Sequence, residues 1–220
     1  MRRRHAGWIA GSAAAALVAA GAITYAVAGE TGGADTSTPD TRTQDTRTPG
    51  AESADAGFAR DMAVHHQQAV EMSFIVRDRT KDEEVRRLAY DIAQTQANQR
   101  GMLLGWLDLW GLPKVSADPP MTWMGMRGMA SGKDGALMPG MATNTELKEL
   151  QSLSGKRAEI LYLQLMTDHH KGGVHMAEGC VAKCTVDVEK RLAQGMVDAQ
   201  RSEIELMAGM LKERGARPRS

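Results

Sequence analysis

Two short windows of this 220-residue chain combine histidine and methionine at helical spacing. Both read Met-x-x-His-His-x-x-x-Val-x-Met, the first over residues 62–72 and the second over residues 166–176, 104 positions later. They hold five of the six histidines of the chain. At about 100° per residue, the paired histidines and the outer methionines of each window fall on one side of a helix. Imidazole and thioether groups together suit a soft or borderline transition metal, above all copper.

The alternative is that both stripes only pack in a protein core, because methionine fills irregular core gaps well. A buried imidazole needs polar partners, however, so adjacent histidines are an unusual choice for packing alone. The recurrence of the histidine pair with both methionines at fixed offsets therefore favours metal binding. The candidate ligands are Met62, His65, His66, Met72, Met166, His169, His170 and Met176.

Residues 112–143 carry a second group of methionines among glycines and prolines, without a helical period. This composition predicts a mobile loop. Thioethers bind Cu(I) without losing a proton, so the loop either captures metal or forms an apolar flap over the helices. The additional candidate ligands are Met121, Met124, Met126 and Met129 in the loop and His175, Glu203 and Met207 on predicted helices.

The chain has two cysteines, Cys180 and Cys184, just after the second histidine window. An even number of cysteines in an exported protein usually oxidises, so we expect a disulfide between them. Ligation of a metal by the two thiolates is the alternative, because Cys180 also continues the second stripe by one turn.

An internal repeat positions these residues. The same 104-residue offset aligns residues 58–111 with 162–215 without a gap, including Gln96 with Gln200 and Gly111 with Gly215. This alignment indicates that a helix-turn-helix unit has been duplicated. The predicted helices span about 55–79, 82–110, 154–179 and 186–214, with a capping box from Thr80 to Glu83 opening the second.

Two short-looped hairpins of this kind predict an all-α four-helix bundle over residues 57–215. We expect the pseudo-two-fold symmetry to place the two histidine helices parallel and diagonal, roughly 11–14 Å apart. Inward-facing side chains from both helices would then share a central metal site.

The N-terminal segment is read as a targeting signal. Three arginines at positions 2–4 precede an uncharged run from Gly7 to Gly29, which is long enough to span a bilayer. Residues 1–29 are therefore either a transmembrane anchor or a signal peptide cleaved after Ala28. Residues 30–56, rich in Thr, Asp and Pro, predict a disordered linker. The bundle would then face the outside of the cell membrane, or be secreted after cleavage.

The net charge of the chain is zero and there is no long basic block, so nucleic acid is not an expected partner. Fifteen methionines against only 4% aromatic residues set the chain apart from ordinary globular composition.

With both histidine motifs and the hairpin repeat, residues 57–215 resemble the bacterial "domain of unknown function 305" family. The resemblance implies a ferritin-like four-helix bundle, and some members are extracytoplasmic copper-binding or copper-resistance proteins that use His and Met. The methionine-rich insert at 112–143 and the cysteine pair depart from a minimal member.

The expected function is therefore non-catalytic: sequestration or transport of Cu(I) or Cu(II), with copper-handling envelope proteins as partners. Two rivals stay open. A ferritin-like di-iron oxidase would need Glu-x-x-His motifs, which the chain lacks. A bundle that only docks a partner would use His and Met for packing.

Overall fold

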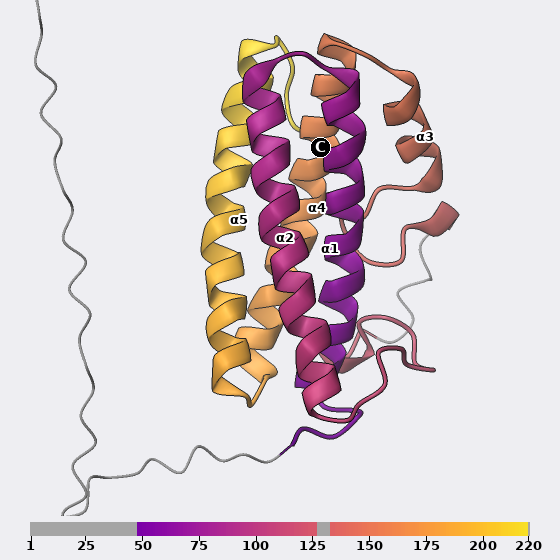
Figure 1. Cartoon of the computed structure of the whole chain (residues 1–220), viewed down its shortest axis with the longest axis vertical. Coiled ribbons are helices and arrows are strands. Elements are labelled where there is room, and N and C mark those ends of the chain that lie inside the picture. The colour runs from indigo at the N-terminus through magenta and orange to yellow at the C-terminus, as the bar shows by residue number, and fades with distance from the viewer. Residues whose placement is uncertain (1–47, 127–132, 220) are drawn as a thin grey trace, which may run out of the picture. The chain divides into compact units, whose positions relative to one another are not determined.

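The computed structural model of this chain describes residues 48–126 and 133–219, which belong to one compact unit, Asp45–Ser220. The anchor or signal peptide and most of the linker lie outside the described residues. The helical elements are α1 (Ala54–Arg79), α2 (Glu83–Leu109), the 3₁₀ turns η1 (Thr122–Met124) and η2 (Lys133–Gly135), α3 (Asn144–Ser152), α4 (Lys156–Lys183) and α5 (Asp187–Glu213). No strand occurs in the described residues, and the expected all-α bundle of two hairpins is confirmed (Figure 1).

The four long helices begin and end close to the predicted positions, with local differences. Ser53 caps α1 by accepting a hydrogen bond from the amide of Ala56, and Asp82 caps α2 through the amide of Val85. The predicted capping box from Thr80 is wrong, because Thr80 ends α1 and donates its hydroxyl to Glu159. α4 runs one turn beyond the predicted end at residue 179 and includes the first cysteine.

The two histidine helices, α1 and α4, are antiparallel and in direct contact, which corrects the expected parallel, diagonal arrangement. At one end, the amide of Gly155 donates to the carbonyl of Arg79 over 2.7 Å. At the other end, the amide of Thr185 donates to Asp55 over 2.7 Å. The two-fold axis that relates the hairpins therefore lies across the helices rather than along them, and the repeat alone does not fix its direction.

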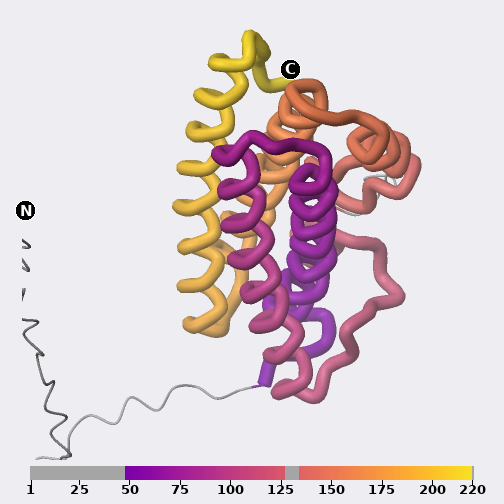
Figure 2. Tube along the Cα trace, turned by 45° about the horizontal axis from the view of Figure 1, so that its top comes forward, coloured from indigo at the N-terminus to yellow at the C-terminus, as the bar shows by residue number. Residues whose placement is uncertain are grey.

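Helix α3 was not predicted, although Thr143 and Glu146 form a full capping box at its start. It buries Leu147 and Leu150 beside α1 and α4 on the outside of the bundle (Figure 1). Figure 2 shows the described parts of the chain between α2 and α3 running along the outer side of α1.

The described part of the methionine insert packs onto the bundle, which is the arrangement expected of the apolar flap. Asp61 accepts hydrogen bonds from the amide of Met121 and from the indole of Trp123, at 2.7 and 2.9 Å. Gly57 and Gly179 leave the room that the insert needs, since a Cβ there would stand 2.5 Å from Trp123 and 2.6 Å from Met124. Met129 lies outside the described residues.

The core consists of two apolar clusters at opposite ends of the bundle. Met72 and Met166 belong to the cluster near the α1–α2 turn, and Met62 and Met176 belong to the cluster near the α4–α5 turn.

In the described residues, no helix is both long and apolar enough to cross a membrane.

Candidate metal centre

A layer of buried polar side chains separates the two apolar clusters where α1 crosses α4. Its members are fully or almost fully buried: His65, His66, Gln96, His169, His170 and Gln200. The layer lies at mid-helix because each histidine pair is near the centre of its own helix, so an antiparallel crossing still brings the pairs together. Polar groups buried this deeply need partners, so their hydrogen bonds decide what the layer can do.

His65 and His169 meet at the crossing itself. Their rings stack with centroids 3.7 Å apart and an interplanar angle of 29°. Nε2 of His169 lies 3.0 Å from the carbonyl oxygen of His65. Because a carbonyl only accepts, Nε2 of His169 carries the hydrogen, and its Nδ1 keeps a free lone pair.

His170 points the other way, toward α5. Its Nε2 lies 2.6 Å from Oε2 of Glu203. A carboxylate oxygen accepts in this contact, so Nε2 of His170 carries the hydrogen and Nδ1 is the nitrogen left without a partner. Histidines that bind metals usually donate their second ring N–H to a carboxylate or a backbone carbonyl, and His169 and His170 both have such a partner.

The first half of the repeat has a weaker version of the same contact. His66 on α1 corresponds to His170 on α4, and Gln99 on α2 corresponds to Glu203 on α5. The Gln99 side chain is close enough to His66 to offset part of the lowering of its pKa that burial causes. Neither ring nitrogen of His66 makes a hydrogen bond of normal geometry, however. The two halves therefore differ by one carboxylate.

Six imidazole nitrogens in this layer make no hydrogen bond of normal geometry with the described residues. They are both ring nitrogens of His65 and of His66, and Nδ1 of His169 and of His170. Each such buried group costs free energy unless a donor, an acceptor or a cation satisfies it. A bound metal ion would satisfy several of them at once, so the donor set fits a metal.

Burial keeps His65, His66 and His169 neutral, the form that binds metals. Loss of hydration lowers the pKa of His65 and of His66 to about 3, with the neighbouring imidazoles adding to the effect. The same two causes hold the pKa of His169 well below its ordinary value.

The four methionines of the two motifs are fully buried on either side of the histidines. Met62 and Met176 lie in one flanking cluster, and Met72 and Met166 lie in the other. Each thioether is therefore within one or two turns of an imidazole on its own helix. Sulfur and nitrogen donors of this kind match a soft or borderline ion.

The histidines do not form a closed three-nitrogen site as arranged. Among the described residues, the only His, Cys, Asp or Glu side chains with three ligand atoms within 4.8 Å of one another are Cys180, Cys184 and Glu189. A single ion in the histidine layer would thus bind at most two imidazoles without ring rotation. Its remaining ligands would have to come from thioethers.

The other predicted ligands are dispersed. His175 is exposed on α4, and Met207 is buried in the cluster near the α1–α2 turn. Met121, Met124 and Met126 pack in the opposite cluster, with Met62 and Met176. Cys180 and Cys184 form a disulfide at the α4–α5 turn.

Sequence reasoning missed the role of Glu203 and the two buried glutamines. Glu203 was a candidate ligand, whereas in the structure it orients an imidazole. Gln200 occupies the space left by Gly173, where a Cβ would stand 2.4 Å from its Oε1. The exact match of Gln96 with Gln200 in the repeat was the available signal for this pair.

The family model DUF305, described as a domain of unknown function, matches residues 55–211. No curated protein matches the chain. A predicted secreted DUF305 protein from Streptomyces coelicolor is 72% identical, with a TM-score of 0.72 over 78% of this chain and 99% of the other. A DUF305 fragment from Deinococcus radiodurans is 30% identical, with a TM-score of 0.60 over 73% of this chain and 96% of the other.

A third solved structure is CopM in its Cu(II)-bound form. It is 21% identical to this chain, with a TM-score of 0.56 over 73% of this chain and 97% of CopM. The Cu(I)-bound form of CopM gives 19% identity and a TM-score of 0.53 over 72% and 96% of the two chains. Likeness at this level of identity establishes the common fold.

Proposed function

This chain belongs to the DUF305 family, and we propose that it is an extracytoplasmic copper-binding protein that sequesters or carries the metal without catalysis. The observation that carries the proposal is the buried layer between α1 and α4, with its six unpartnered imidazole nitrogens between two thioether clusters. A layer of this kind is costly as packing and favourable as a ligand set.

Copper is favoured over iron by the donor types. In the described residues, Glu203 is the one carboxylate that contacts a histidine of the layer, whereas di-iron bundles use a carboxylate from each of four helices. Thioethers add a preference for Cu(I), and imidazoles accept either oxidation state. CopM, which has the same fold, was solved with Cu(II) and with Cu(I) bound, and this agrees with the choice of metal.

Location outside the cytoplasm is part of the same proposal. The arginine-led apolar run at the N-terminus supports export, and the Streptomyces relative is described as a predicted secreted protein. Export also suits the disulfide at the α4–α5 turn. Other copper-handling proteins of the envelope would be its partners.

The test is a copper titration of the purified protein and of the double variant His66→Ala/His170→Ala. We expect the double variant to lose most Cu(II) bound in the bundle, and copper to raise the Tm of the wild type but not of the double variant, because the metal binds the folded arrangement. His175→Ala is the matched control, because His175 is an exposed histidine of the same helix. Equal Cu(II) binding by the double variant and the wild type would show that the histidines are core residues only.

A further inference from the structure

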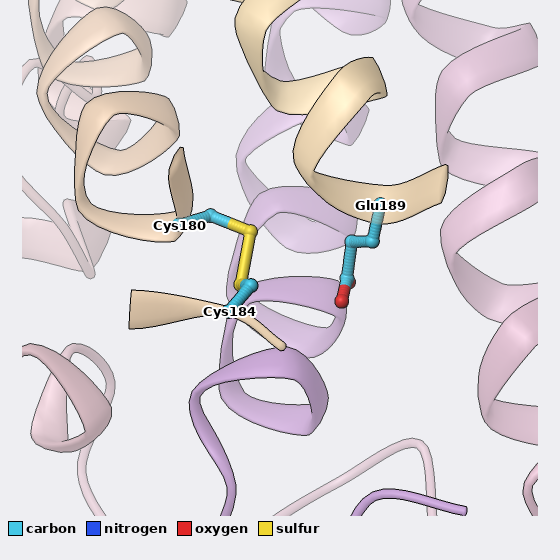
Figure 3. Close-up of side chains that lie close together, drawn as sticks. All are labelled: Cys180, Cys184 and Glu189. Atoms are coloured by element: carbon cyan, nitrogen blue, oxygen red, sulfur yellow. A yellow bond between two sulfur atoms is a disulfide. The ribbon is translucent and has the colours of Figure 1, made fainter. Parts of the chain in front are cut away.

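A second group of potential ligands lies at the α4–α5 turn, away from the histidine layer. Cys180 and Cys184 are joined there by a disulfide, and the side chain of Glu189 extends beside the sulfur atoms from the first turn of α5 (Figure 3). The two sulfurs and a carboxylate oxygen lie within 4.8 Å of one another. All three residues are buried, with at most 3% of any of them exposed.

The Glu189 carboxyl has no basic partner in this position. Neither of its oxygens accepts a hydrogen bond, and no basic side chain pairs with it among the described residues. While it carries a proton, it donates a hydrogen bond to the neighbouring Asp55 carboxylate, which also accepts from the amides of Thr185 and Val186 at 2.7 and 2.8 Å. A buried carboxyl without a basic partner needs either this proton or a cation.

We infer that reduction of the Cys180–Cys184 disulfide opens a second metal site, in which the two thiolates and the Glu189 carboxylate bind one zinc-like divalent cation. Zinc accepts sulfur ligands at about 2.3 Å and carboxylate oxygen at about 2.0–2.2 Å. Two sulfurs in a tetrahedral zinc site therefore lie about 3.8 Å apart. Rotation of two cysteine side chains whose Cα atoms are 4.8 Å apart reaches this separation.

The chemistry balances with an external thiol as the reductant. The S–S bond breaks, each cysteine sulfur gains one electron and one proton, and two R–SH molecules become R–S–S–R. Burial and the nearby Asp55 carboxylate raise the pKa of Glu189 to about 9, so this carboxyl holds a proton at neutral pH. Metal binding then releases three protons, two from the thiols and one from Glu189.

The site would be controlled by the redox state of its surroundings. In an oxidising compartment the disulfide occupies both sulfur ligands and the site is closed. Reduction opens it without dismantling the bundle, because the bridge spans only the last turn of α4 and its C-cap. This behaviour is independent of copper binding in the histidine layer.

The experiment measures Zn²⁺ bound by the full chain before and after reduction with dithiothreitol and anaerobic removal of the reductant. We expect the reduced protein to bind one more equivalent of Zn²⁺ than the oxidised protein, and Co²⁺ to give a sulfur-to-metal charge-transfer band only after reduction. Cys180→Ser/Cys184→Ser should lose both effects, and Glu189→Gln should weaken the additional site at least tenfold. Glu205→Gln, at an exposed position of α5, is the matched control and should change neither.

Two further arms keep the outcome clear. The His66→Ala/His170→Ala variant should keep the redox-dependent Zn²⁺ equivalent, so failure of the proposed copper function and failure of this site are distinguishable. Circular dichroism should show unchanged helix content on reduction. Equal Zn²⁺ binding by oxidised and reduced protein, full affinity in Glu189→Gln, or loss of helix on reduction would each overturn the inference.

Discussion

The imidazole rings of His65 and His169 stack with centroids 3.7 Å apart at the crossing of α1 and α4. Both side chains are fully buried, and these two residues occupy equivalent positions of the internal repeat. Two imidazolium ions at this separation would repel each other strongly in a medium of low dielectric constant. The crossing therefore requires neutral rings, and protonation must oppose folding.

The first prediction concerns stability in mild acid. The pKa of His65 and of His66 is about 3 in the folded chain against an ordinary value of 6.5, so the unfolded chain binds protons more readily. Stability from this source is complete above about pH 6.5 and is lost as the pH falls toward 3, by at most about 1.4 kcal/mol per histidine and pH unit. Urea unfolding of the metal-free protein between about pH 7 and pH 5, where few ordinary carboxyls titrate, measures this loss.

Protonation of Glu189 changes the stability of the fold in the opposite direction between pH 7 and pH 5. Its pKa is raised from 4.5 to about 9, so the folded chain binds the extra proton and stability rises as the pH falls. Glu189→Gln should therefore make the acid-induced loss of stability steeper. A free energy of unfolding that stays constant from pH 7 to pH 5 in this variant would contradict the neutral histidine layer.

The low pKa of the buried histidines also changes the pH at which copper should be released. For imidazoles of ordinary pKa, copper affinity would fall as the pH drops through about 6–6.5. With His65, His66 and His169 held neutral by burial, the metal should instead be released together with unfolding at lower pH.

The second prediction concerns the hydrogen bond between His170 and Glu203. Glu203→Gln removes the carboxylate that orients the imidazole and makes the second half of the repeat resemble the first, where Gln99 stands. We expect copper affinity to fall by about 10–100-fold, the usual effect of losing such a partner. Isothermal titration calorimetry with Cu(II) measures it.

The reverse change provides the complementary test. Gln99→Glu gives His66 a carboxylate partner and should raise copper affinity, whereas Glu205→Gln on the exposed face of α5 should leave it unchanged. If Glu203→Gln and Glu205→Gln bind copper equally well, then Glu203 has no part in the site.

The helices and the histidine layer were predictable because their signals are local. The stripes of His and Met fix which side of α1 and α4 is buried, and Gly111 and Gly215 mark the ends of α2 and α5. The 104-residue offset also reveals a two-fold relation between hairpins. The direction of the two-fold axis is a property of packing, so the antiparallel crossing of α1 and α4 could not be derived from the repeat.

The insert shows a second limit of sequence reasoning. Its composition predicts a loop, yet Asp61, Gly57 and Gly179 hold Trp123 and Met124 against the bundle. These contacts join residues more than fifty positions apart, and no local sequence pattern indicates them. Helix α3 is a different case, since its capping box at Thr143 and Glu146 is a local signal in the sequence.

The third prediction tests how α4 accepts the chain before α3. A Cβ at Gly172 would lie 2.0 Å from the carbonyl oxygen of Pro139, so Gly172→Ala must displace a backbone segment. We expect it to destabilise the fold by about 2 kcal/mol or more, as overpacking does. Thermal unfolding of the metal-free protein measures the effect.

Gly195→Ala is the matched control for this change. Gly195 lies inside α5 with open space around its Cβ position, so alanine there should stabilise the helix by about 0.5–1 kcal/mol. Destabilisation of the same size in both variants would mean that the contact at Pro139 is not the cause.

The last prediction concerns the methionines of the insert. Met121 is buried, and Met124 and Met126 pack in the cluster that contains Met62 and Met176. Deletion of residues 119–141 would uncover this cluster, so leucine substitution at positions 121, 124 and 126 is the better test, because it keeps apolar volume and removes only sulfur. If these thioethers bind Cu(I), the triple variant should bind less Cu(I), keep its Cu(II) and keep its helix content. Met210→Leu, in the opposite cluster, should bind both ions like the wild type. Unchanged Cu(I) stoichiometry in the triple variant would mean that the insert is an apolar cover and that copper binding rests on the histidine layer and its four flanking thioethers alone.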